Sequence, residues 1–518
     1  MMSTLELFVV TRFCAGAILC LVCHVCLFTP VLSVCVISQG KMERILCYFV
    51  LIFYFVTSDA FSYDAFSSSS TGDFRQFAAG NFESILTDSC SISRTSHHQI
   101  GKGPERSEKK TKQHFEIVSR TTSKTEEMNS IPEHNFVTNV TNSTISSEAP
   151  YDDKATEEDY ELHLLPNSSE SGAVCLDGTP PGYYFHNGSG IGKFKWIIFF
   201  QGGAWCHDPD TCYQRSSTAL GSSACLRRHL RLEGLLSNKV KYNPEFYNWT
   251  KVFVPYCDGA SFTGNREKPL KVKNKLLYFR GRRILEALSD DLLRRGIDKA
   301  SEIILSGRSA GALTAIIHTD YIRTRFRRAE NASFRILADA GFFVDAPSLN
   351  GTEIIRSAFQ KLYTLHNSAL NQACLGAQKR KQEWRCLFPQ YSVPFVNTPI
   401  FLVNSLYDLW QIAYLSNIPC VLNIKTCNST EMSQIMKFRK KTLRALRSVF
   451  DSRKTAVFAD ACLVHTQCVM NALWTRIQVQ NVTISQAFTD WYRGDQQERF
   501  RIDGLYPCNL TCPKHYGI

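Results

Sequence analysis

The chain lacks the sequence patterns that hold metals, bind nucleotides or read nucleic acids. No His-Glu-x-x-His motif occurs in its 518 residues, and no pair of Cys-x-x-Cys motifs has zinc-finger spacing, which argues against a metal centre. Its formal net charge is +12, but no basic motif interleaved with aromatic residues and no DNA-binding signature accompanies that charge. The run Gly188-x-Gly190-x-Gly192 is not followed by a strand-turn-helix unit, which argues against nucleotide binding. We therefore predict no metal, no organic cofactor and no nucleic-acid partner. The scattered basic residues favour at most a polyanion, such as an acidic or sulfated glycan.

Charged residues are also absent from Phe13 to Gly40, a stretch long enough to span a bilayer. A second apolar stretch, Ile45 to Val56, follows Met42-Glu43-Arg44 and precedes small or polar residues, which is the layout of a cleavable signal peptide. We predict that Met42 is the functional start of a protein secreted through the ER. The alternative is a membrane anchor formed by residues 13–40.

Cysteine, by contrast, is abundant, with 20 in the chain, and the downstream cysteines fall in close pairs. Short cystine loops formed in an oxidising compartment explain this spacing better than a metal cluster does. Ten Asn-X-Ser/Thr sequons also favour passage through the ER. The close pairs are Cys206/Cys212, Cys374/Cys386, Cys420/Cys427, Cys462/Cys468 and Cys508/Cys512.

Three parts of the chain differ in composition. Residues 1–62 hold the apolar N-terminal segments. Residues 63–172 are rich in Ser, Thr, Lys and Glu and poor in apolar periodicity, so they are predicted to be a disordered, glycosylated spacer. Residues 173–518 are predicted to form the folded domain.

Short β-branched or aromatic runs alternate with amphipathic helical patterns in the folded domain. This alternation predicts an α/β fold with a mostly parallel sheet covered by helices on both faces. Functional residues in such sheets lie on loops beyond the carboxyl ends of the strands. The predicted strands are Lys195 to Phe200, Val252 to Val254, Ile303 to Leu305, Ile336 to Leu337, Ile400 to Val403 and Ala456 to Phe458.

The segment Gly307-Arg308-Ser309-Ala310-Gly311 lies between a predicted strand and a predicted helix. This is the context of a nucleophile elbow, where the glycines permit a sharp turn and close helix packing and the serine hydroxyl is left exposed. We therefore predict that Ser309 is a nucleophile.

A serine hydroxyl needs a base to accept its proton, and in this architecture the chain order is serine, acid, histidine. His465 follows the strand ending at Phe458, and Asp408 follows the strand ending at Val403, so they are the preferred base and acid. The competitors are His366 and His515 for the base, and Asp339 and Asp460 for the acid.

Stabilising a tetrahedral intermediate requires backbone N–H groups near the nucleophile. Gly202 and Gly203 directly follow the strand ending at Phe200, and Ala310 follows the serine. Their N–H groups are the predicted oxyanion hole.

The order of several motifs resembles that of the pectin acetylesterase and Notum family, from Ala173 to the C-terminus. The motifs are AVCLDGTPPGYYF, FQGGAWC, TALGSS, NPEFYNW, YCDGASFTG, LSGRSAGALTAIIHTD, LADAGFF, CLFPQY, TPIFLVNSLYDLWQI, YRG and YPCNLTC. The resemblance implies an α/β-hydrolase-like fold and assigns Ser309, Asp408 and His465 to the family's triad. It likewise assigns Gly202, Gly203 and Ala310 to the oxyanion hole. It also implies disulfides Cys175–Cys257 and Cys206–Cys212, whereas Cys90 and Cys225 have no obvious partner.

Departures from the family pattern concern substrate identity rather than the triad. Gln201 replaces an acidic residue, Ala204 and Ala312 replace glycines, and Arg308 replaces the cysteine of the plant enzymes. The candidate pocket residues are Trp205, Arg308, Leu387 and Phe388. The resemblance implies a secreted serine carboxylesterase that removes O-acetyl groups from a polysaccharide. The alternatives are a deacylase for an acylated protein, as in Notum, and a catalytically inactive glycan-binding module.

Overall fold

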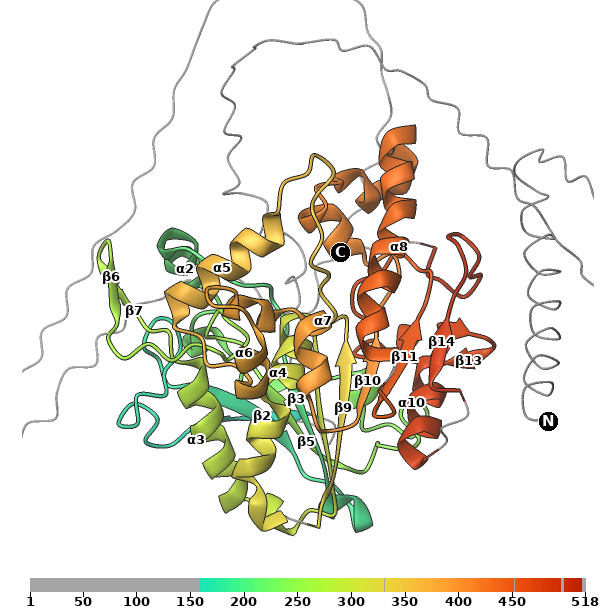
Figure 1. Ribbon diagram of the computed structural model, residues 1–518. Coiled ribbons are helices and arrows are strands. Elements are labelled where there is room, and N and C mark those ends of the chain that lie inside the picture. The colour runs from blue at the N-terminus through green and yellow to red at the C-terminus, as the bar shows by residue number, and fades with distance from the viewer. Residues whose placement is uncertain (1–158, 330, 451, 495–497, 515–518) are drawn as a thin grey trace, which may run out of the picture. The chain divides into compact units, whose positions relative to one another are not determined.

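A mostly parallel sheet runs through the folded domain (Figure 1). The computed structural model describes residues 159–329, 331–450, 452–494 and 498–514. Within these ranges the sheet has the strand order β14-β11-β10-β9-β8-β3-β5-β2-β1-β4. The strands from β14 to β5 are parallel, and β2, β1 and β4 continue the sheet antiparallel at one edge. The strands are β1 (Tyr160–Leu164), β2 (Gly182–His186), β3 (Lys195–Phe200), β4 (His229–Leu230), β5 (Thr250–Val254), β8 (Glu302–Arg308), β9 (Ser333–Asp339), β10 (Ile400–Val403), β11 (Thr455–Ala459) and β14 (Phe500–Ile502).

Alternate side chains of the buried strands enter two hydrophobic cores, one on each face of the sheet. In β3, Trp196, Ile198 and Phe200 belong to one core, while Ile197 and Phe199 belong to the other. The helices of the first core are α3 (Gly281–Arg294), α4 (Ala310–Arg325) and α8 (Ser429–Phe450), and those of the second are α9 (Asn471–Arg476) and α10 (Ile484–Arg493). The remaining α-helices of the described residues are α2 (Pro209–Arg215), α5 (Ile354–His366), α6 (Gln372–Ala377) and α7 (Pro389–Ser392). Two hairpins pair β6 (Leu270–Val272) with β7 (Lys275–Leu277) and β12 (Gln478–Val479) with β13 (Val482–Thr483).

The predicted α/β architecture is confirmed. The six apolar runs identified in the sequence lie within β3, β5, β8, β9, β10 and β11. Their burial on both faces explains why they read as continuous apolar runs.

The predicted start of the folded domain at residue 173 is too late. Strand β1 pairs with both β2 and β4, and the buried Tyr160 donates its hydroxyl to Leu236 O at 2.6 Å. The strand was missed because it directly follows an acidic run whose composition is typical of a linker. The rest of the predicted spacer and the predicted signal and anchor segments lie outside the described residues. In the part of the chain that the structure describes, no helix has the length and hydropathy required to cross a bilayer.

Two of the predicted cystine loops are wrong, both near the C-terminus. Cys512 pairs with Cys462, so neither Cys508–Cys512 nor Cys462–Cys468 forms; Cys508 is an exposed thiol and Cys468 a buried one. Tertiary structure determines this pairing, because the segment after β14 returns to the loop after β11 and brings Cys512 to Cys462. In the same contact, Asp503 Oδ2 accepts from Ala461 N at 2.9 Å. The other disulfides between described residues are Cys175–Cys257, Cys206–Cys212, Cys374–Cys386 and Cys420–Cys427, as expected. Cys225 is disulfide-bonded as well, and Cys90 lies outside the described residues.

Candidate active site

Ser309 sits at the turn between β8 and α4 in a conformation that few non-glycine residues adopt. Its φ is 54° and its ψ is −125°. The two flanking glycines are required by close backbone approach. A Cβ on Gly311 would lie 2.1 Å from Phe200 O, and one on Gly307 would lie 2.4 Å from the Gly311 carbonyl. The local geometry is therefore that of a nucleophile elbow.

The structure brings Ser309, Asp408 and His465 together at the carboxyl end of the sheet. His465 Nε2 lies 2.9 Å from Ser309 Oγ, and its Nδ1 lies 3.0 Å from each carboxylate oxygen of Asp408. Since an ionised carboxylate only accepts hydrogen bonds, Nδ1 carries the proton and Nε2 is free to accept from the serine hydroxyl. All three side chains are buried, with Asp408 fully inaccessible. The arrangement can transfer the serine proton to the imidazole.

Of the predicted oxyanion-hole residues, Gly202 and Ala310 adjoin the serine, and Gly203 follows Gly202. A Cβ on Gly202 would lie 2.9 Å from Ser309 Cβ, so only a glycine allows this approach. Gly203 has a φ of 139°, and Arg215 Nη1 donates to its carbonyl at 2.8 Å. Ala310 is the first residue of α4, where backbone N–H groups have no partner within the helix.

Two aromatic rings lie beside the imidazole of His465, and two more pack behind them. Trp410 stacks on the imidazole of His465 at 5.6 Å between ring centroids, and Phe343 lies 6.4 Å from the imidazole. Trp205 packs edge-on against Phe343 at 4.7 Å and against Phe359 of α5 at 4.9 Å. We call Trp205, Phe343, Phe359 and Trp410 the aromatic wall.

The other predicted pocket residues lie further from the serine hydroxyl or on its flank. Leu387 and Phe388 are buried, and Phe388 packs on Phe359 at 4.7 Å, so they stand behind the aromatic wall. Arg308 is half-buried at the end of β8, directly before the serine. The sequence did not indicate Phe343 as a site residue, although it lies in LADAGFF, one of the motifs that carry the family resemblance.

Ser261 is a further residue that sequence reasoning missed. Its Oγ accepts from Trp205 Nε1 at 2.7 Å and donates to Ala310 O at 2.8 Å. It therefore connects the aromatic wall to the first turn of α4. Its motif YCDGASFTG gave no local signal for this role, because both partners are distant in the sequence.

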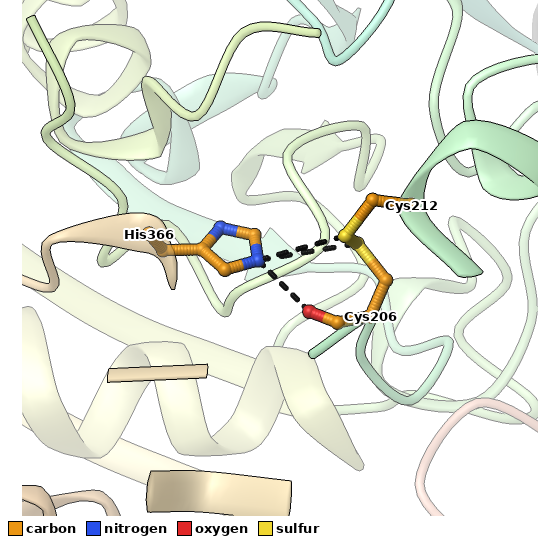
Figure 2. Close-up of side chains that lie close together, drawn as sticks. All are labelled: Cys206, Cys212 and His366. Atoms are coloured by element: carbon orange, nitrogen blue, oxygen red, sulfur yellow. Dashed lines mark hydrogen bonds between the residues drawn. A yellow bond between two sulfur atoms is a disulfide. The ribbon is translucent and has the colours of Figure 1, made fainter. Parts of the chain in front are cut away.

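His366 supports the loop that carries Trp205 and is not a second base. Figure 2 shows its ring beside the Cys206–Cys212 disulfide, with Nε2 2.8 Å from Cys206 O and 3.9 Å from each sulfur. The two sulfurs are bonded to each other, so they offer no thiolates to a metal ion. Burial lowers the pKa of His366 to about 3, so the ring is neutral at physiological pH.

Asp339 and Asp460, the competing acids, lie near His465 but not on its ring nitrogens. Asp339 accepts from the backbone N–H groups of Gln467 and Cys468, and Asp460 accepts from Cys462 N and Gln467 Nε2. Both carboxyls therefore bind the loop around His465. The remaining competitor for the base, His515, lies outside the described residues.

Comparison with known proteins supports the resemblance seen in the sequence. A family model described as Pectinacetylesterase matches residues 153–513. Pectin acetylesterase 5 of Arabidopsis thaliana is 37% identical over 366 residues, which cover 68% of this chain and 84% of that protein. The palmitoleoyl-protein carboxylesterase notum2 of Xenopus laevis is 31% identical over 391 residues, covering 71% of this chain and 77% of that protein. The solved structure of the Wnt deacylase Notum from Drosophila has a TM-score of 0.61 at 23% identity, covering 68% of this chain and 99% of that chain, which supports the fold. The chain thus belongs to the pectinacetylesterase family and is a carboxylic ester hydrolase.

Proposed function

We propose that this protein is a secreted serine esterase that removes O-acetyl groups from an acidic polysaccharide. The observation that carries the proposal is the continuous contact from Ser309 Oγ through the imidazole of His465 to both oxygens of Asp408. The disulfides and sequons support secretion, since disulfides form and sequons are glycosylated in the ER.

The reaction proceeds in two steps. Ser309 Oγ attacks the ester carbonyl while His465 Nε2 takes its proton, and the backbone N–H groups of Gly202, Gly203 and Ala310 bind the oxyanion. The imidazolium, held by Asp408, then protonates the leaving alcohol and an acetyl-enzyme remains. Water, deprotonated by the same imidazole, attacks the acetyl-enzyme, and the imidazolium gives this proton to Ser309 Oγ as the ester bond breaks. Acetic acid leaves and ionises to acetate.

Two features support an acetylated, polyanionic polysaccharide as the substrate. Phe343 and Trp410 of the aromatic wall lie beside the imidazole of His465, and Trp205 packs on Phe343, an arrangement that favours a short acyl group. An open groove of about 630 Å³ runs along α5, the helix that carries Phe359 of the wall. Its lining includes the cations Arg266 and Lys361 against the single acid Asp208, a balance that favours a polyanionic chain. Burial lowers the pKa of His207, so this ring adds no charge at neutral pH. Relatives named pectin acetylesterases are consistent with such a substrate.

The test is hydrolysis of p-nitrophenyl esters from acetate to palmitate, together with release of acetate from acetylated pectin, by the wild-type protein and Ser309→Ala. We expect the optimum at acetate and a loss of at least about 1,000-fold in Ser309→Ala. An optimum at long chains would favour an acylated protein as the substrate. Equal, negligible rates for both proteins would favour an inactive glycan-binding module.

A further inference from the structure

We propose that Asp339 is a positioning residue of the active site, whose carboxylate holds the loop that carries His465 while its backbone holds Ser309. This inference rests on the proposed function. Asp339 is the last residue of β9 and is fully buried. It cannot be the acid of the triad, because Nδ1 of His465 already faces Asp408.

The carboxylate makes its contacts just after the histidine. Gln467 N donates to Oδ1 at 3.1 Å and to Oδ2 at 2.9 Å, and Cys468 N donates to Oδ2 at 2.8 Å. These two N–H groups are two and three residues beyond His465. Since charged acceptors form stronger hydrogen bonds than neutral ones, an ionised Asp339 restrains the loop more firmly than an amide would.

The backbone of the same residue reaches the nucleophile. Ser309 N donates to Asp339 O at 2.8 Å, at the point where β8 and β9 pair in register. A single residue is thus bonded both to the strained turn of Ser309 and to the loop of His465. Any shift of Asp339 would change the distance between the reacting oxygen and nitrogen, to which proton transfer is highly sensitive.

The surroundings of the Asp339 carboxylate determine its pKa. Burial raises the pKa of Asp339 to about 6, while the N–H groups of Cys468 and Gln467, then the charges of His465 and Arg308, act in the opposite direction. The thiol of Cys468 is neutral, because burial and Asp339 raise its pKa. Asp460 belongs to the same network through Gln467 Nε2, which donates to it at 2.9 Å, and burial raises the pKa of Asp460 to about 7. The negative charge of Asp339 therefore stands close to the imidazole and favours its charged form during the reaction.

The experiment compares the wild type with Asp339→Asn, which keeps the shape and removes the charge. We expect kcat for p-nitrophenyl acetate to fall about 10- to 100-fold with KM within about threefold. The acid limb of the kcat/KM profile should move to lower pH, because the imidazolium loses a neighbouring negative charge. The melting temperature does not separate the two roles, because the amide places a donor beside Gln467 N and weakens the loop contact in either case. A merely structural role would leave the pH profile unmoved.

The matched control is Asp291→Asn, a buried carboxyl on α3 that accepts from Tyr183 Oη and pairs with Arg294 rather than with the histidine loop. It should leave kcat and the acid limb unchanged. If Asp339→Asn does not fold, Asp339→Glu takes its place, because it keeps the charge but displaces the carboxylate from Gln467 N and Cys468 N. A folded Asp339→Glu with the kcat of the wild type would overturn the proposal. A wild-type protein that hydrolyses no ester would refute the proposed function instead.

Discussion

Single residues at the site each bind two segments that are far apart in the sequence, Ser261 through its hydroxyl and Asp339 through its carboxylate and its backbone carbonyl. Ser261 binds Trp205 and Ala310, and Asp339 binds the turn of Ser309 and the loop of His465. Because both partners of each residue belong to the catalytic geometry, these contacts hold it before substrate arrives. Such preorganisation is what electrostatic catalysis requires.

At the residue scale, His366 makes the stability of the folded protein depend on pH. Its pKa is about 3 in the folded protein against an ordinary value of 6.5, so between these values the unfolded chain binds a proton that the native protein does not. Stability contributed by this residue is therefore lost as the pH falls below about 6, by about 1.4 kcal/mol per pH unit for one proton.

We predict that His366→Asn is less stable than the wild type at pH 8, because it loses the packing of the ring on Phe279, 4.6 Å away between centroids. This deficit should shrink as the pH falls from 6 to 4. Urea-unfolding free energies at pH 8, 6, 5 and 4 measure it, and the value at pH 8, where the ring is neutral in both states, is the internal control. A deficit that is constant from pH 6 to 4 would contradict the assignment of a buried, neutral histidine.

At the scale of elements, a short π-helical segment, Gln411–Leu415, begins three residues after Asp408 and connects the acid to the aromatic wall. Gln411 N donates to Asp408 Oδ1 at 2.9 Å. Its side chain donates from Nε2 to Phe342 O at 3.2 Å and accepts from Val344 N at 3.0 Å. The amide thus fixes the backbone on both sides of Phe343, the ring that faces His465.

We predict that Gln411→Met, a change of similar size, costs about 2 to 4 kcal/mol of stability because it leaves Phe342 O and Val344 N unsatisfied in a buried site. It should also lower kcat for p-nitrophenyl acetate, because Phe343 loses its support. Thermal unfolding and steady-state kinetics measure the two effects. Gln372→Met, at an exposed position on α6, is the control and should change neither. Wild-type behaviour of Gln411→Met would show that the loop does not depend on this amide.

Elements with a strong local pattern were predictable, and those that depend on distant partners were not. The turn at Ser309 has its strand, glycines and helix within a few residues, so the sequence alone indicates it. The antiparallel edge of the sheet could not be predicted from the sequence, because β4 has only two residues and β1 follows an acidic run. The choice between Asp408 and Asp339 rested on strand order alone, since each follows a strand closely. Their different contacts, one with the imidazole and one with the loop backbone, depend on tertiary geometry.

Across the whole molecule, the C-terminal segment braces the loops that carry the acid and the base. After β14, Asp503 accepts from Ala461 N, and Tyr506 N donates to the hydroxyl of Tyr407, the residue before Asp408. The Cys462–Cys512 disulfide closes the same contact covalently, three residues before His465. The end of the chain is therefore coupled to the active site through both loops.

This coupling predicts different effects for two neighbouring cysteines. Cys512→Ser opens a bond that spans 50 residues, so the unfolded chain gains conformational freedom worth about 4 kcal/mol. Cys508→Ser removes only an exposed thiol and should change the free energy of unfolding by less than about 0.5 kcal/mol. Thermal unfolding of the two variants measures the difference, and mass spectrometry of non-reduced peptides identifies the bond. If Cys508 and Cys512 were paired with each other, both variants would break the same short loop and lose similar stability. Because the opened bond adjoins the loop of His465, Cys512→Ser should also lose esterase activity at a lower temperature than Cys508→Ser does.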